Sequence, residues 1–389
     1  MAQHLGLADF RTDREGAAVK LLVAVLLAAL NPLVVLAHEM RPAIGTATIQ
    51  KDGSFAVVLS LNLEAVIAGV GPEHSDTGDS AQAPLYDELR ALPPEVLREW
   101  FSAVAPRLER GVSLGPATPE AAPLTVVGVT IPPVGDLAEA RISEVTLTGR
   151  FSPGTRDVLW SFDPDFGDSV IRLGMSGEEE LFHSQYVSGG VSAPIPLDSS
   201  IERKVGSIFS EYLRLGFIHI VPKGLDHILF IVGLFLLSTR RSVLLWQITA
   251  FTLAHTITLA LGTVGIVRLS PAIVEPLIAL SIVYVAVENL VTTRLTPWRP
   301  LIVFGFGLLH GLGFAGVLGE IGLSTSSFVI GLVAFNIGVE LGQLAVIAAC
   351  FVLLGWAMRL PDYRRFIVRP GSVAIALVAA FWSVERALI

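Results

Sequence analysis

The pattern of apolar and polar residues divides the chain into two parts that meet near residue 205. Beyond that point, apolar residues fill segments of helical length at about 224–238, 243–263, 272–290, 300–319, 327–355 and 370–386. A membrane-spanning helix needs about 20 mostly apolar residues. The pattern therefore predicts an all-α bundle of six transmembrane helices over residues 224–389.

A further apolar and aromatic segment precedes the first of these spans. It contains Phe209, Tyr212 and Phe217, with Lys204 and Arg214 beside them. Apolar and basic residues combined in this way are typical of a helix that lies in the membrane interface. We therefore expect an interfacial helix and linker over residues 204–223.

Residues 38–203 show shorter apolar runs, in part alternating with polar residues and separated by turn residues. The run Ser54–Leu63 is β-prone, and the Asp52-Gly53 pair before it predicts a hairpin turn. One helical stretch, Leu85–Arg110, is expected to break at Pro93-Pro94. These features predict a β-rich, sandwich-like domain with a helical insertion. Further predicted strands are Leu124–Ile131, Arg141–Thr148 and Val158–Phe162.

The N-terminus resembles a secretory signal. Lys20 precedes the apolar run Leu21–Leu30, and Val35-Leu36-Ala37 supplies small or modest residues before a cleavage point. We expect residues 1–37 to be a signal peptide, so that His38 begins the mature chain. The alternative is an uncleaved anchor helix over Lys20–Ala37, whose length approaches that of a span.

Basic residues in the loops orient the predicted bundle. They gather in alternate loops, and loops rich in Lys and Arg remain in the cytoplasm. The β-rich domain then lies outside, which agrees with a signal peptide and predicts a protein of the bacterial inner membrane with a periplasmic N-terminal domain. The arginines that set this orientation are Arg240, Arg241, Arg294, Arg299, Arg359, Arg364, Arg365 and Arg369.

Composition and charge exclude several classes of protein. The 389 residues are 52% hydrophobic and 16% charged, with a mean hydropathy of +0.65, as expected for a membrane protein with an aqueous domain. A net charge of -8 provides no basic field for nucleic acid. The single cysteine, Cys350, rules out an intramolecular disulfide and a multi-thiolate metal site.

Polar residues set into the apolar spans are the chemically informative positions. A charged side chain at the bilayer centre costs about 3 kcal/mol even on a mild scale, so such residues pair with one another or serve a function. Imidazole and carboxylate groups on separate helices, converging at one depth, suit a divalent metal ion. The predicted metal ligands are His219, Asp226, His227, His255, His310 and Glu340, with Glu275, Asn336 and Gln343 as supporting polar groups.

Helical spacing refines this prediction. Asn336, Glu340 and Gln343 fall at i, i+4 and i+7, so they share one face of their helix. Several glycines surround His310, and small residues let neighbouring helices approach closely. Glu288 lies near the cytoplasmic end, where we expect it to pair with Arg294.

Five stretches also resemble the HupE/UreJ membrane proteins, in particular the branch with an N-terminal periplasmic domain. That family includes nickel permeases, so the resemblance implies movement of Ni²⁺ or Co²⁺ into the cytoplasm and an association with hydrogenase or urease systems. The family's first signature, a His followed by Asp-His, corresponds here to His219, Asp226 and His227, with six intervening residues where the family has five. The second signature is reduced to His310-Gly311, and Glu340 is the replacement for its carboxylate. The stretches are His219–Phe230, Phe251–His255, Ala279–Tyr284, Leu309–Phe314 and Phe335–Gln343.

Three functions remain open from the sequence. The first is a permease for a divalent transition-metal ion, Ni²⁺ or Co²⁺ before Zn²⁺. The second is an intramembrane zinc-dependent hydrolase, with Glu340 as base. The third is a metal-receiving or assembly protein, in which the amine and imidazole of a mature His38 would chelate the ion.

Overall fold

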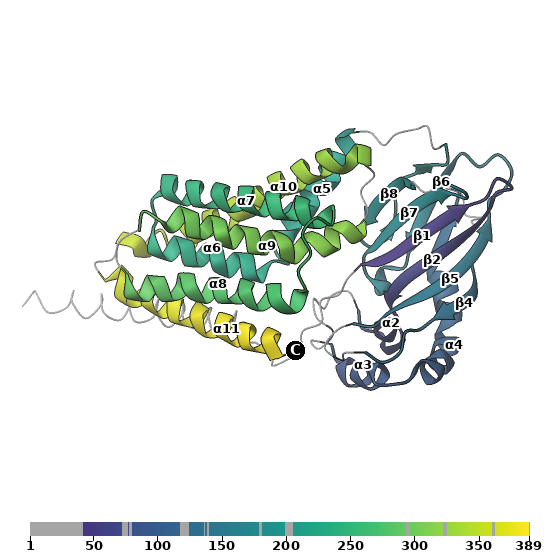
Figure 1. Cartoon of the computed structure of the whole chain (residues 1–389), viewed down its shortest axis with the longest axis horizontal. Coiled ribbons are helices and arrows are strands. Elements are labelled where there is room, and N and C mark those ends of the chain that lie inside the picture. The colour runs from purple at the N-terminus through teal and green to yellow at the C-terminus, as the bar shows by residue number, and fades with distance from the viewer. Residues whose placement is uncertain are drawn as a thin grey trace, which may run out of the picture. The chain divides into compact units, whose positions relative to one another are not determined.

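A computed structural model describes residues 42–71, 77, 80–116, 124–135, 137, 140–178, 181–198, 205–292, 296–321, 325–359 and 362–388. The chain forms two compact units, a β-rich domain and a helical bundle, and Figure 1 shows the elements of each. The predicted signal peptide, His38 and Arg294 lie outside the described residues.

The β-rich domain contains two sheets. In the described part of the chain, its larger sheet has six strands; β1 and β7 pair in parallel, and the other neighbouring strands are antiparallel. In sheet order these strands are β4 (Thr125–Thr130), β5 (Ile142–Arg150), β2 (Ser54–Asn62), β1 (Ala43–Ile49), β7 (Ser169–Met175) and β8 (Leu181–Val187). In the smaller sheet, β6 (Asp157–Phe162) pairs with β3 (Val112–Gly115), β9 (Gly190–Val191) and β10 (Ile195–Pro196).

Trp160 joins the two sheets across the core. Its side chain is fully buried, and its Nε1 donates a hydrogen bond to Ser169 Oγ at 3.0 Å. On β1, the position facing the indole is Gly45, where an added Cβ would lie 3.0 Å from the ring. A tryptophan from one sheet packed on a glycine of the other gives the sandwich-like arrangement expected from the sequence.

The predicted turn and helical insertion are confirmed. Gly53 has a φ of 79°, and both the hydroxyl and the N–H of Ser54 donate to the Asp52 carboxylate, which lowers the pKa of Asp52 to about 2. The helical stretch breaks before Pro94 into α3 (Ala83–Arg90) and α4 (Pro94–Gly111). A short helix that the sequence did not suggest, α2 (Leu63–Ala68), begins after Asn62, whose side chain caps it.

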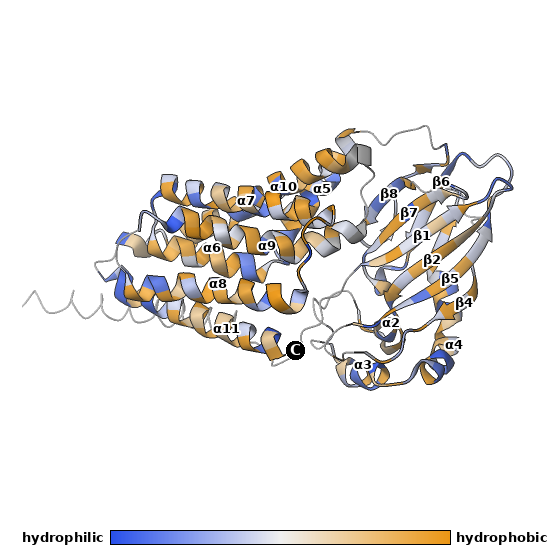
Figure 2. Ribbon diagram, viewed as in Figure 1, coloured by the Kyte–Doolittle hydropathy of each residue, from blue (hydrophilic) through white to orange (hydrophobic). Residues whose placement is uncertain are grey.

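Among the described residues, the helical unit contains seven α-helices. They are α5 (Val205–Ile220), α6 (Leu225–Leu237), α7 (Arg241–Thr263), α8 (Pro271–Val291), α9 (Arg299–Ile321), α10 (Thr325–Leu354) and α11 (Arg369–Leu388). Within the described residues, five of these helices are long and apolar enough to cross a membrane, and hydrophobic residues make up much of the ribbon of the helical unit (Figure 2).

A candidate sixth span is a bent pair of shorter helices. With 13 residues, α6 is about 20 Å long, which is less than the roughly 30 Å of a hydrocarbon core. Helices α5 and α6 meet the length and composition of a span only together, and they are bent by 67° at the break between them. The segment expected in the membrane interface therefore supplies half of a candidate span.

Close backbone contact places α5 against α10. A Cβ added at Gly216 would collide with the carbonyl oxygen of Phe335, and one added at Gly338 would collide with that of Leu213. On α9, Gly307 and Gly311 approach the backbone of α7 at Phe251 and His255 in the same way. Small residues on α9 thus bring two helices together, as the sequence predicted.

Candidate metal centre

Four histidines from four helices meet inside the bundle. His219 ends α5, His227 lies in the first turn of α6, and His255 and His310 lie within α7 and α9. The centroid of the His227 ring is 4.8 Å from that of His219, 4.7 Å from that of His310 and 6.1 Å from that of His255. His219 reaches this group because the chain bends directly after it.

Three of these imidazoles have the spacing of a ligand set. One nitrogen from each of His219, His227 and His255 lies within 4.8 Å of the other two. Nitrogens bound tetrahedrally to an ion at about 2.1 Å are roughly 3.4 Å apart, so a modest inward movement would suffice. Among the described residues, no hydrogen-bond partner meets His219 Nε2 or His255 Nε2, although both atoms are buried. Two unpartnered nitrogens in a buried cluster fit a metal ion.

The ring of His255 is held by Asn336. His255 Nδ1 lies 3.2 Å from Asn336 Oδ1, and the Asn336 amide donates to Leu332 O at 2.8 Å, which orients its oxygen toward the imidazole. Because the amide oxygen can only accept, His255 carries its proton on Nδ1 and presents the lone pair of Nε2. Asn336 therefore orients a ligand and does not lie in the ligand set.

His310 is held in a similar way by Ser281. The hydroxyl of Ser281 donates to Ile278 O at 2.6 Å, so its oxygen accepts from His310 Nε2 at 3.3 Å. His310 Nδ1 then faces His227 Nε2 at 3.4 Å with its lone pair. His310 can hold His227 in position, or supply a fourth nitrogen after a small shift.

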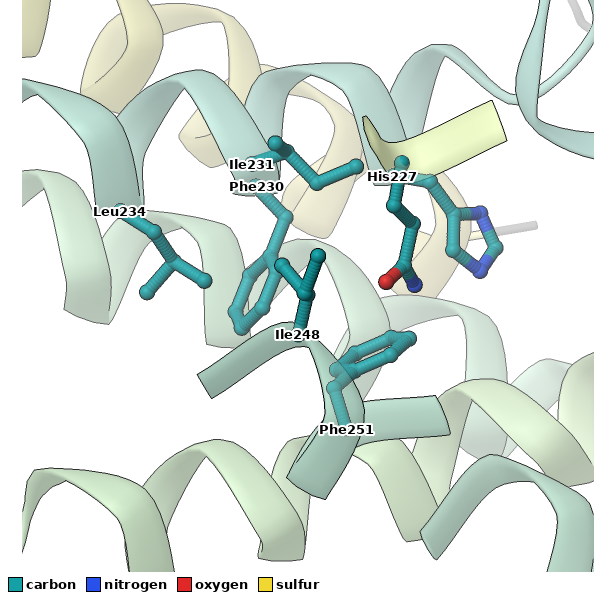
Figure 3. A pocket seen from close by; sticks show the side chains of 7 residues that line it. His227, Phe230, Ile231, Leu234, Ile248 and Phe251 are labelled. Atoms are coloured by element: carbon teal, nitrogen blue, oxygen red, sulfur yellow. The ribbon is translucent and has the colours of Figure 1, made fainter. Parts of the chain in front are cut away.

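Aromatic side chains enclose the cluster. Phe314 packs on His219 with ring centroids 4.2 Å apart, and Phe251 packs on His310 at 5.0 Å. Figure 3 shows five apolar side chains gathered on one side of His227, and the space between them is too small for a water molecule. These residues, Phe230, Ile231, Leu234, Ile248 and Phe251, form an apolar plug beside the imidazoles.

The carboxylates that the sequence placed in the site lie elsewhere. Asp226 forms a two-point ion pair with Arg386 on α11, at 2.7 and 3.3 Å. Adjacent helical residues point about 100° apart, so Asp226 faces α11 while His227 faces the cluster. Glu340 accepts a hydrogen bond from Thr249 at 2.7 Å on the outside of the α7–α10 contact. Only histidines form the close group among the described residues.

The remaining predicted groups have separate partners. Gln343 accepts from Thr252 at 3.2 Å in the buried contact between α10 and α7. Glu275 lies near enough to Arg386 to interact with it electrostatically. At the opposite end of α8, Glu288 pairs with Arg299 at 2.9 Å, where we expected Arg294.

Arg386 is the residue that sequence reasoning missed. It lies in the last turn of α11, far in sequence from the histidines, yet it binds Asp226 and lies near Glu275. Its signal in the sequence was a single basic residue near the end of an apolar helix. Such a residue has to find a partner or reach the interface.

A model of one protein family matches the helical part of the sequence. The model of the HupE/UreJ protein family matches residues 197–386, which contain α5 to α10 and nearly all of α11. No curated protein and no solved structure matches the chain. The resemblance seen in the sequence is thereby confirmed over the helical unit and both halves of the bent span. Residues 197–386, which form the helical part of the chain, match the HupE/UreJ family.

Proposed function

We propose that this protein moves a divalent transition-metal ion across the bacterial inner membrane, with its β-rich domain in the periplasm. The observation that carries the proposal is the group formed by His219, His227 and His255, whose ligand atoms lie within 4.8 Å of one another. The match to the HupE/UreJ family supports the proposal, because that family is associated with nickel or cobalt transport or with metalloenzyme maturation.

The chemistry of the ligands narrows the substrate. Imidazole nitrogens suit Ni²⁺, Co²⁺ and Zn²⁺, whereas soft Cu(I) prefers sulfur and hard Mg²⁺ and Ca²⁺ prefer oxygen. We propose Ni²⁺ or Co²⁺ first, following the family, and Zn²⁺ after them.

A site for transport has to release its ion as well as bind it. No carboxylate joins the close histidine group among the described residues, so the ion would meet neutral nitrogens alone. The apolar plug beside His227 leaves no space for water. We infer that, in the described arrangement, the histidines hold the ion and the apolar plug blocks its movement beyond them.

Metal accumulation tests the proposal. Cells that express the wild type should accumulate one of these metals at limiting external concentration, measured by elemental mass spectrometry. His227→Gln and His255→Gln should each lose most of that accumulation, because each removes one of three nitrogens. His183→Gln, in the β-rich domain, is the matched control and should accumulate like the wild type. Full accumulation by either bundle variant, at equal protein in the membrane, would contradict the proposal.

A zinc-dependent hydrolase is the second candidate, because three imidazoles are also a ligand set of catalytic zinc. The two functions differ in how firmly the metal is held. A hydrolase should retain one zinc ion per chain through purification, whereas a permease should exchange its ion with free metal. Radioactive or isotopic exchange on the purified protein distinguishes them.

A supply of metal to hydrogenase or urease maturation is the wider role that the family supports. If this protein provides that metal, cells that lack the protein should show lower activity of a nickel enzyme at low external nickel. Added nickel should restore the activity.

A further inference from the structure

A second polar site lies at the other end of the bundle, where α7 and α9 begin. The first two turns of α7 and the residues that lead into α9 enclose a cleft of about 360 Å³. It is lined by Ser242, Val243, Trp246, Gln247, Thr296, Pro297, Arg299 and Pro300. None of these residues takes part in the histidine cluster.

Two buried side chains in the wall of this cleft are short of hydrogen bonds. Arg299 and Gln247 are each 1% exposed. Within the described part of the chain, Arg299 Nε and Nη2 and Gln247 Oε1 have no hydrogen-bond partner. Arg299 Nη1 is 2.9 Å from Glu288 Oε2, an ion pair whose angles fall outside hydrogen-bond geometry. Glu288 therefore holds the guanidinium group at Nη1, whereas Nε and Nη2 lack an acceptor among the described residues.

Other hydrogen-bond donors besides Arg299 also lie at the cleft. It lies at the N-terminus of α7, where the first-turn N–H groups of Arg241 and Ser242 have no acceptor within the helix. The hydroxyls of Ser242 and Thr296 also line it. Helix N-termini favour anions, and a guanidinium group matches the geometry of phosphate oxygens. The guanidinium group of Arg299 offers only donors and no lone pair to a cation, so this cleft is not a second metal site.

We propose that the cleft binds a phosphate group, anchored by the free edge of Arg299 and by the donors at the start of α7. Glu288 neutralises the single positive charge of the guanidinium group. The affinity for phosphate is therefore provided by the hydrogen bonds and by the N-terminus of α7. The phosphate belongs either to an anionic lipid headgroup or to a small phosphate compound in solution. Trp246, which is 64% exposed beside the cleft, is a residue type enriched at the membrane interface, where lipid phosphates lie.

The test uses the purified full-length protein in detergent and two variants. In the double variant Glu288→Gln with Arg299→Gln, both charges are removed together, so that neither is left buried alone. Thr296→Val removes a hydroxyl from the rim and does not touch the ion pair. Circular dichroism and gel filtration establish that each variant is folded.

Two probes are added in separate arms. Phosphatidylglycerol, with phosphatidylcholine as the zwitterionic control, is followed by native mass spectrometry, and inorganic phosphate is followed by the unfolding temperature. The wild type should bind at least one anionic probe. The double variant should bind that probe more weakly by about tenfold or by a larger factor, and Thr296→Val should bind it about threefold more weakly. Binding of phosphatidylglycerol alone identifies the lipid, and a response to inorganic phosphate identifies a soluble ligand. A wild type that responds to neither, or a folded double variant that binds as well as the wild type, overturns the proposal.

Discussion

Single residues decide how the imidazoles are presented, and Asn336 is the clearest case. Its amide oxygen fixes the proton of His255 on Nδ1 and leaves Nε2 for a metal ion. Removing a partner that orients a metal-binding histidine typically lowers affinity by about 10- to 100-fold. Asn336→Leu should therefore bind Ni²⁺ or Co²⁺ more weakly by about that factor in a titration of the purified protein.

The matched control for this prediction is Asn336→Asp, which keeps an oxygen acceptor for His255 and should bind far more tightly than the leucine variant. Equal affinity in the wild type and the leucine variant would show that Asn336 only fills space.

The ion pair of Asp226 with Arg386 gives a second prediction at this scale. The two side chains are 20% and 23% exposed, so the pair is partly screened, and breaking it should cost about 1–3 kcal/mol of stability. If Asp226 only holds the first turn of α6 in place, Asp226→Asn and Arg386→Gln should weaken metal binding to a similar extent. If Asp226 is instead a ligand, Asp226→Asn should abolish binding while Arg386→Gln leaves most of it. Metal titrations of both variants and of the double variant separate the two roles.

The sequence identified the histidines that the structure brings together, but not the partners of the other polar residues. The four histidines were singled out because each is polar within an apolar segment, a signal that needs no knowledge of the fold. Spacing along one helix does not determine which neighbour a side chain meets, so Asp226 and Glu340 were predicted as ligands, whereas the structure pairs them with Arg386 and Thr249. In the β-rich domain, β7 was missed because its residues are buried on both faces and do not alternate.

Among the elements, α9 depends on two kinds of glycine. Gly307 contacts the backbone of α7, whereas a Cβ added at Gly305 would meet no atom within 4 Å. Gly307→Ala should therefore force α7 and α9 apart, at a cost of about 1–3 kcal/mol. It should also weaken metal binding, because His255 and His310 lie on these two helices.

Gly305→Ala is the control on the same helix, and alanine there should be neutral or slightly stabilising because it favours the helical state. Thermal unfolding of both variants in detergent is the measurement. A stability loss of equal size in the two would show that the close contact at Gly307 contributes nothing.

At the scale of the whole molecule, the predicted topology can be tested with the cysteine content of the chain. Cys350 is the only cysteine and is buried, so Cys350→Ala provides a background without a thiol. In that background, Ser152→Cys lies on the exposed surface of the β-rich domain and Arg240→Cys lies in the exposed loop before α7. A membrane-impermeant maleimide should label Ser152→Cys in intact cells and Arg240→Cys only after the membrane is opened. The opposite pattern would reverse the orientation of the bundle.

The contact between α5 and α10 bears on how the protein is assembled at the ribosome. At Gly216 and Gly338 the backbones of α5 and α10 lie too close for any side chain to fit between them. Each of these two helices therefore packs directly against the other. The ribosome makes α5 first and completes α6, α7, α8 and α9 before α10 emerges. Until then α5 lacks the helix on which it packs, and the position of His219 at the end of α5 is not fixed from that side. The candidate metal centre is therefore completed late in synthesis, and a chain that stops before α10 should contain all four histidines without their final arrangement.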